Sequence, residues 1–306
     1  MHPSAPSIDA LTAITLDDLV VSFGCAQRPL LARGLRRLFA RPARTFASQM
    51  AEFDADTARL GLPEAARRSQ RHFVREVRVV CERPLPPGPV LALSNHPGMA
   101  DTLSLFGALD RDDLRIIALD RPFLTSLPHT SERLFFVRDD DSRSRAHLVR
   151  QVSTHLRHGG AVLTFPAGHI EPDPDVAAGA VDSLNTWTNS VGVFLRLAPQ
   201  TVVVPVLVRG VLWRTTANPP LRLLRRSREE RERLAAAVQL LAHVACHLKA
   251  VTVRVDVGRP ITAQELGTTD ARAVHTAVLT EMKRLCAAAA RPCGAALCSS
   301  GLPTER

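Results

Sequence analysis

The stretch that decides the fold is Ser94-Asn95-His96-Pro97-Gly98-Met99-Ala100-Asp101. It follows a short apolar run, 90–93, and precedes the apolar segment 102–109, which has the composition of a helix. A buried strand that ends at a histidine on a Pro-Gly turn, just before a helix, places an imidazole and a carboxylate on one loop. Asp101 can then fix the tautomer of His96 and leave its other ring nitrogen free to take a proton from a hydroxyl. The alternative is that His96 closes a turn and Asp101 caps the helix.

Short apolar strands alternate with helices on both sides of this loop. The expected strands are 74–81, 90–93, 115–119, 134–137, 161–165, 201–208 and 251–257, and the expected later helices are 142–157, 181–197, 227–248 and 270–289. This alternation predicts an α/β fold with a mixed, largely parallel sheet that is flanked by helices and carries its site on loops at the strand ends. We expect an N-terminal helical segment over 1–72, an α/β domain over 73–290 and a flexible tail over 291–306.

The N-terminal segment contains a basic amphipathic stretch, 28–41. Its apolar residues Leu31, Leu35, Leu38 and Phe39 are expected on one helical face. The arginines on the other face are Arg33, Arg36, Arg37 and Arg41. This pattern suits a helix that lies on an anionic membrane surface, and it also suits a helix packed on the domain with a solvated arginine face. Beyond Pro42, the apolar spacing predicts a second helix that ends at Gly61 and packs into the core.

Composition narrows the class of protein. The 306 residues are 45% apolar and 23% charged, enough for a sizeable core, and the formal net charge is +9. Such a charge favours anionic partners, but aromatic residues are only 4% and tyrosine is absent, which argues against nucleic-acid binding. No apolar run reaches the length of a membrane-spanning helix and no signal peptide is recognised. We therefore expect six reduced cysteines and a cytoplasmic protein that associates peripherally with the inner face of the membrane.

Other chemistry-bearing groups are weaker candidates. His243 and His247 flank Cys246 at helical spacing, but they lack the glutamate and the third ligand of a zinc site. The acidic run 139–141 precedes a helix and is better explained by capping than by magnesium binding. The arginine cluster 222–228 is a second basic patch. No P-loop, G-x-S-x-G or G-x-G-x-x-G motif occurs, so we predict no metal and no nucleotide cofactor.

Four sequence blocks, in order, resemble the glycerolipid acyltransferases, the superfamily that includes lysophosphatidic acid acyltransferase. Asn95-His96 and Asp101 resemble its N-H-x4-D signature, also written HX4D. The second block is similar to Phe135-Phe136-Val137-Arg138, the F-P-E-G block to Phe165-Pro166-Ala167-Gly168 and the final V-P-V block to Val204-Pro205-Val206. The resemblance covers about residues 77–211. It implies an O-acyltransferase domain that acts in phospholipid synthesis or remodelling.

The resemblance also implies roles for single residues. His96 would take the proton of an acceptor hydroxyl, which attacks the thioester of acyl-CoA or acyl carrier protein, while Asp101 holds and polarises His96. Backbone N–H groups near Gly168 would face the developing oxyanion. The substrate-binding residues that it implies are Asn95, Pro97, Gly98, Arg138, Arg143, Phe165, Pro166, Gly168, Val204 and Pro205.

The chain departs from the family at positions that bear on the acceptor. Ala167 and Ile170 stand where the family has glutamate and arginine, and Arg138 follows Val137 directly instead of after one variable residue. Glu171 is a candidate substitute for the missing acid. The acceptor therefore stays open between glycerol phosphates, lysophospholipids and other lipids. A rival hypothesis is a non-catalytic acyl-lipid binding protein on a degenerate acyltransferase scaffold.

Overall fold

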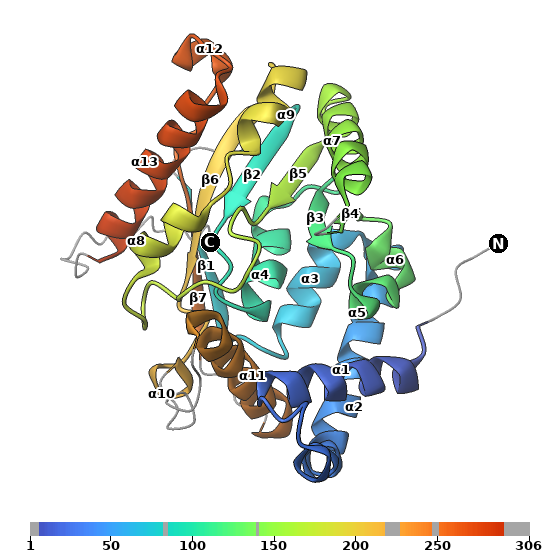
Figure 1. The fold of residues 1–306 in the computed structure, drawn as a ribbon. Coiled ribbons are helices and arrows are strands. Elements are labelled where there is room, and N and C mark those ends of the chain that lie inside the picture. The colour runs from blue at the N-terminus through green and yellow to red at the C-terminus, as the bar shows by residue number, and fades with distance from the viewer. Residues whose placement is uncertain (1–5, 82–84, 139–140, 218–226, 247–250, 291–306) are drawn as a thin grey trace, which may run out of the picture.

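A seven-stranded sheet forms the centre of the computed structural model, which describes residues 6–81, 85–138, 141–217, 227–246 and 251–290 (Figure 1). The strand order is β1-β7-β6-β2-β5-β3-β4, and neighbouring strands are parallel except for the antiparallel pair β6 and β7. The strands are β1 (Glu76–Cys81), β2 (Val90–Ser94), β3 (Arg115–Leu119), β4 (Leu134–Val137), β5 (Ala161–Thr164), β6 (Val202–Arg209) and β7 (Thr252–Val257). The predicted mixed, largely parallel α/β architecture is thus confirmed.

Helices cover both faces of the sheet because the strands alternate their side chains between two cores. Val90 and Ala92 of β2 belong to one core, with α3 (Leu62–Gln70) and α4 (Met99–Leu109). Leu91 and Leu93 belong to the other core. The helices of that second face are α7 (Ser142–Arg157), α9 (Val191–Leu197) and α13 (Ala271–Ala289). Since β2 is buried on both faces, it reads as a continuous apolar run.

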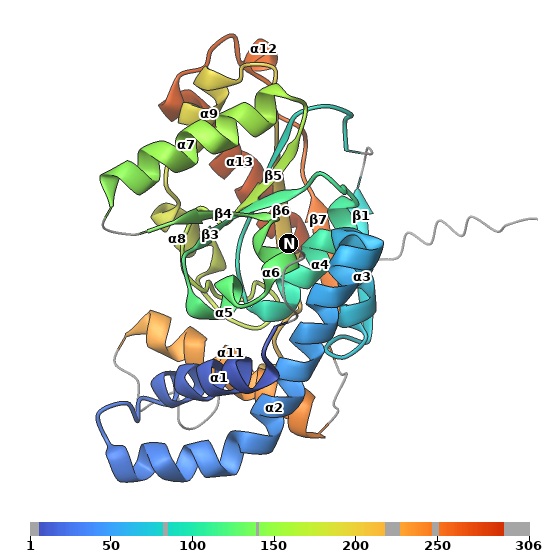
Figure 2. The same cartoon turned by 90° about the vertical axis from the view of Figure 1, so that its right-hand side faces the viewer.

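The N-terminal region consists of α1 (Ile8–Ser22), the 32-residue helix α2 (Pro29–Leu60) and α3. The predicted break at Pro42 is wrong, because Pro42 lies inside α2. Proline removes the N–H that would bond the Leu38 carbonyl. Leu38 is on the surface, where water can satisfy that carbonyl. Figure 2 shows α2 changing direction along its length, as expected for an internal proline. Its second half buries Phe46 and Phe53 in the core that the sheet shares, while the boundary of the N-terminal segment at residue 72 stays a prediction.

The predicted helix 181–197 is also wrong, because the chain forms three short pieces there. The other helices are α5 (Pro122–Thr125), α6 (Pro128–Ser131), α8 (Ala180–Ser183), η1 (Leu184–Thr186), α10 (Arg214–Ala217), α11 (Arg228–Cys246) and α12 (Ala263–Leu266). Trp187 is extended after η1, and the Thr188 N–H donates to the Pro166 carbonyl at 3.1 Å. Between η1 and α9, the Thr188 N–H thus bonds a distant carbonyl and not one in its own helix.

Helices α1 and α11 lie together below the sheet in Figures 1 and 2 and contact each other. Across the described ranges, no helix is both long enough and apolar enough to cross a membrane. Several expected features lie outside the described residues: the tail 291–306, Asp139, Asp140, His247, Arg222, Arg225, Arg226, Cys293 and Cys298.

Candidate active site

His96 and Asp101 meet on the loop that connects β2 to α4. The Nδ1–H of His96 donates to Asp101 Oδ2 at 2.9 Å, and the Gly98 N–H donates to the same oxygen at 2.9 Å. The Thr102 hydroxyl donates to Asp101 Oδ1 at 2.9 Å, so both carboxylate oxygens are occupied. The Asp101 side chain is fully buried, whereas that of His96 is 27% exposed. Among the described residues, none bonds the Nε2 of His96, which leaves it available to a substrate.

Asp101 reaches this position because α4 starts at Met99, three residues earlier than the sequence predicts. Asp101 is thus the third residue of the helix, and its carboxylate closes the first turn by accepting the Gly98 N–H. A carboxylate there also interacts favourably with the positive end of the helix dipole. The two readings of the loop are therefore compatible, since one carboxylate caps the helix and orients His96.

Glu171 holds the other side of the His96 backbone. The His96 N–H donates to Glu171 Oε2 at 3.1 Å, and the Glu171 N–H donates to the His96 carbonyl at 2.8 Å. The Glu171 side chain is fully buried. Its second oxygen, Oε1, accepts from the Ser183 hydroxyl and from the Trp187 indole N–H, each at 2.9 Å. The candidate substitute for the family acid is thus joined directly to the predicted base.

The electrostatics of the site favour a protonatable His96. Burial of the ring opposes the imidazolium, but the Asp101 charge and hydrogen bond, with a smaller contribution from Glu171, outweigh it and raise the pKa of His96 above its ordinary value. The Arg121 charge acts in the opposite direction. Burial raises the pKa of Glu171, although its three hydrogen-bond donors and His96 oppose that change. His96 therefore has the character of a strengthened base.

The predicted residues of the first block differ in their roles. Both ends of the Asn95 amide bond the backbone of Val208 at 2.8 Å, so Asn95 ties the His96 loop to β6. Pro97 and Gly98 are buried in the loop between His96 and α4. Asn95 therefore shapes the loop that carries His96, and its contact with a substrate stays a prediction.

The third block contacts His96 through an aromatic ring. The Phe165 ring packs against the His96 ring with centroids 4.6 Å apart. The Gly168 N–H donates to the Phe165 carbonyl at 3.0 Å and so closes a turn, which removes it as an oxyanion donor. Gly168 has a φ of +71°, a conformation that favours glycine, and its place beside a substrate stays a prediction. Pro166 is buried.

The fourth block lies inside the sheet. Val204 pairs with Ala92 and Pro205 with Leu93, which places both in mid-strand, before the end of β2. Val204 is fully buried in the core. Both residues build the central strands of the sheet, and their place in the wall of a substrate pocket stays a prediction.

Two of the predicted arginines lie at the edge of the sheet. Arg138 follows β4, three strands from β2, or about 14 Å at the usual strand spacing. It is exposed and its Nε lies 2.8 Å from Asp120 Oδ2. Arg143 is in the first turn of α7, where its N–H donates to the capping Asp141. Neither is brought to His96, and their part in binding a phosphate stays a prediction.

Arg121 is the cation that sequence reasoning missed. It lies two residues beyond the end of β3, is exposed, and its charge acts on both His96 and Asp18 of α1. The signal was present in the sequence, because a residue just beyond a parallel strand faces the edge of the sheet where ligands bind.

Of the histidines in the possible zinc site, the structure describes His243. Buried His243 bonds Gln239 through its Nε2 at 2.8 Å and packs against Phe73 and Trp213. In the described ranges, no three His, Cys, Asp or Glu residues are grouped to hold a metal ion. The described cysteines are Cys25, Cys81, Cys246 and Cys286, and no disulfide joins them.

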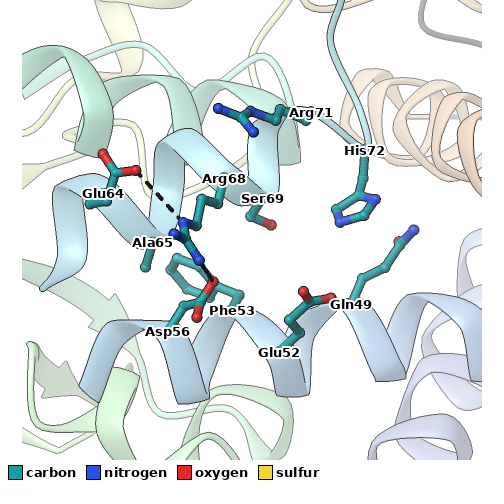
Figure 3. A pocket seen from close by; sticks show the side chains of 10 residues that line it. All are labelled: Gln49, Glu52, Phe53, Asp56, Glu64, Ala65, Arg68, Ser69, Arg71 and His72. Atoms are coloured by element: carbon teal, nitrogen blue, oxygen red, sulfur yellow. Dashed lines mark ion pairs between the residues drawn. The ribbon is translucent and has the colours of Figure 1, made fainter. Parts of the chain in front are cut away.

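A separate pocket of about 350 Å³ lies between α2 and α3 (Figure 3). Three of its charged side chains form ion pairs, since Arg68 lies 3.7 Å from both Asp56 and Glu64. None of the predicted site residues lines it. The pocket therefore belongs to the N-terminal helices and not to the His96 site.

The chain is similar to known proteins in sequence and in structure. Residues 76–209 match the model of the Acyltransferase family. Among solved structures, the chain is similar to the 1-acyl-sn-glycerophosphate (LPA) acyltransferase PlsC from Thermotoga maritima, with 16% identity, a TM-score of 0.45, and coverage of 93% of this chain and 98% of that chain. No curated protein matches the sequence. The family match runs from the first residue of β1 to the last residue of β6 and includes all four sequence blocks. Residues 76–209 therefore match an acyltransferase domain, the reaction class that the four sequence blocks imply.

Proposed function

We propose that this protein transfers a fatty acyl group from an acyl thioester to a hydroxyl of a glycerolipid or lysophospholipid. The observation that carries the proposal is the His96–Asp101 pair on the loop after central strand β2, with Nδ1 held by a buried carboxylate and Nε2 accessible. An acyl-lipid binding module has no physical need for an oriented base of this kind. The family match supports the same reaction class.

The proposed reaction is acid–base chemistry carried by His96. Its Nε2 takes the proton of the acceptor hydroxyl as the oxygen attacks the thioester carbonyl, and the buried Asp101 charge stabilises the imidazolium that forms. The tetrahedral intermediate then collapses, the C–S bond breaks, and the thiolate leaves as the thiol with the proton from His96. The products are an ester and free coenzyme A or acyl carrier protein. No resident cofactor takes part in this sequence.

We further propose that Arg121 attracts an anionic group of the donor or acceptor. It extends from the end of β3 and its charge already acts on His96, whereas Arg138 is paired with Asp120. A phosphate near Arg121 would fit a 1-acylglycerol-3-phosphate acceptor or the phosphates of coenzyme A. Ala167 and Ile170 remain the departures that make another lipid acceptor a serious candidate.

We also propose that the first half of α2 rests on an anionic membrane. One continuous helical face, here called the basic leucine face, combines exposed leucines with arginines. Its members are Leu30, Leu31, Leu38, Arg33, Arg37 and Arg41. The opposite face, with Ala32 and Phe39, packs toward α1, where the Phe23 and Phe39 rings are 5.3 Å apart. The structure thus divides the apolar residues of 28–41 differently from the sequence prediction, because Leu35 and Phe39 face inward while Leu31 and Leu38 stay outside.

The proposed activity is tested by thiol release from long-chain acyl-CoA or acyl carrier protein across a panel of lysophospholipids, glycerol phosphate and amino-lipids. We expect release that depends on one acceptor class and disappears in His96→Ala, while circular dichroism shows that the variant stays folded. His158→Ala is the matched control, since His158 is exposed on the far end of α7 and should leave turnover unchanged. Undiminished turnover in His96→Ala would remove the assignment.

A further inference from the structure

Two carboxylates hold the loop that carries His96, and only one of them, Asp101, matches an acid of the family signature. Asp101 fixes the imidazole from the α4 side. Glu171 fixes the backbone of the same residue through a closed pair of hydrogen bonds, of 3.1 Å to its carboxylate and 2.8 Å from its amide. Glu171 lies four positions after Ala167, the place where the family acid is missing. A buried carboxylate with no ion-pair partner is costly unless hydrogen bonds satisfy it.

Two N–H groups donate to the two oxygens of Glu171: that of the His96 backbone to Oε2 and that of the Trp187 indole to Oε1. The Ser183 hydroxyl lies 2.9 Å from Oε1 and 2.7 Å from the Ala180 carbonyl, and it can donate to either. The Trp187 indole N–H and the backbone N–H of His96 can only donate hydrogen bonds. The site therefore requires a group that accepts at both ends, which at a side chain of this length means a carboxylate.

We infer that Glu171 is a positioning residue for the acyl transfer: it replaces the missing acid from a new place in the sequence and sets the backbone position of His96. This inference rests on the proposed function. Its negative charge adds to that of Asp101 at the imidazolium. The same contacts explain why the chain is not one helix over 181–197. The break between α8 and α9 allows Ser183 and Trp187 to contact the same oxygen of Glu171.

Glu171→Gln tests the inference because the amide cannot satisfy both ends. With its oxygen toward His96, its NH2 faces the Trp187 N–H; with its oxygen toward Trp187, its NH2 faces the His96 N–H. In either orientation, the NH2 group of the glutamine faces another hydrogen-bond donor. A misplacement of about 1 Å at a reacting group can cost about a hundredfold in rate. We therefore expect kcat to fall by about tenfold to a hundredfold with KM within about threefold of the wild type.

Glu171→Gln/Trp187→Phe provides the rescue. Phenylalanine removes the donor, so the glutamine oxygen can accept from the His96 N–H while its NH2 donates to Ser183. We expect kcat to recover to within about tenfold of the Trp187→Phe single variant. The acidic limb of the kcat/KM profile should stay at lower pH than in the wild type, because the charge of Glu171 is still absent. This double variant also avoids the opposed donors that could unfold the single one.

Glu281→Gln is the matched control. Glu281 is also buried, at 8% exposure, and its Oε1 accepts a backbone N–H from Arg259 at 2.7 Å, but it lies on α13. We expect it to lower the melting temperature without changing kcat or the pH profile. A Glu171→Gln variant with the kinetics and pH profile of the wild type, or a double variant with no recovery, would overturn the positioning role. His96→Ala, assayed alongside, separates this failure from a failure of the proposed function.

Discussion

Asp101→Asn should slow the enzyme far more than it loosens the fold. The asparagine oxygen can take the place of Oδ2 and accept from the Gly98 N–H and from His96 Nδ1–H, both now at 2.9 Å. Its NH2 then faces Thr102, whose hydroxyl can rotate and accept. The substitution therefore removes a buried charge while it keeps the hydrogen-bond geometry.

The size of the effect follows from the charge that develops on His96. Two unit charges about 4 Å apart, at an effective dielectric constant of about 20, interact by about 4 kcal/mol. Since each 1.4 kcal/mol or so is tenfold in rate, this corresponds to about a thousandfold in kcat. Water screens part of the interaction because the His96 side chain is 27% exposed. We expect a decrease of about a hundredfold to a thousandfold.

The assay is steady-state thiol release between pH 5 and 9. The pKa of His96 is raised above its ordinary value of about 6.5, so His96 takes up a proton at a higher pH than an ordinary histidine. In the wild type, kcat/KM should therefore fall as the pH drops through that raised pKa. Loss of the Asp101 charge disfavours the imidazolium, so the acidic limb should move to lower pH in the variant. Thr102→Val keeps the charge and removes one hydrogen bond, so it should cost at most about tenfold. An Asp101→Asn enzyme with kcat within threefold of the wild type and an unmoved limb would refute the reasoning.

Three further outcomes are expected. Replacing the three leucines of the basic leucine face by serine, or its three arginines by glutamine, should weaken sedimentation with anionic vesicles at low salt, by about 1 kcal/mol per arginine; equal binding to neutral vesicles would contradict this. Asn95→Leu should lower the free energy of unfolding in urea by about 2–4 kcal/mol, because it leaves the Val208 N–H and carbonyl unpaired. Burial raises the pKa of Cys286 to about 11, so alkylation at pH 8 should modify exposed Cys81 first and Cys286 only in denaturant, as peptide mass spectrometry would reveal.

Local patterns were sufficient to predict the strands and the contact between His96 and Asp101. The bounds 115–119 and 134–137 agree with β3 and β4, because each is a short apolar run between polar or proline-containing segments. The continuity of α2 was harder to predict, because proline usually ends a helix. The tertiary contacts of Phe46 and Phe53, which stabilise the turns after Pro42, are not visible in the local sequence. Glu171 and Trp187 could not be joined from sequence, because a side chain's donors and acceptors carry no periodic signal. Arg121 was overlooked although its place just after a predicted strand was informative.

The sequence separation of the contacts at His96 has a consequence for how activity is acquired. The bond to Asp101 spans five residues and can form as soon as the β2 loop and α4 exist. The bond to Glu171 spans 75 residues, and that between Asn95 and Val208 spans 113. Contacts of such separation close late, since the chain loses loop entropy before they form. During refolding, or during synthesis of the chain, the oriented base should therefore precede its supports, and full turnover should return only when β5 and β6 have joined the sheet.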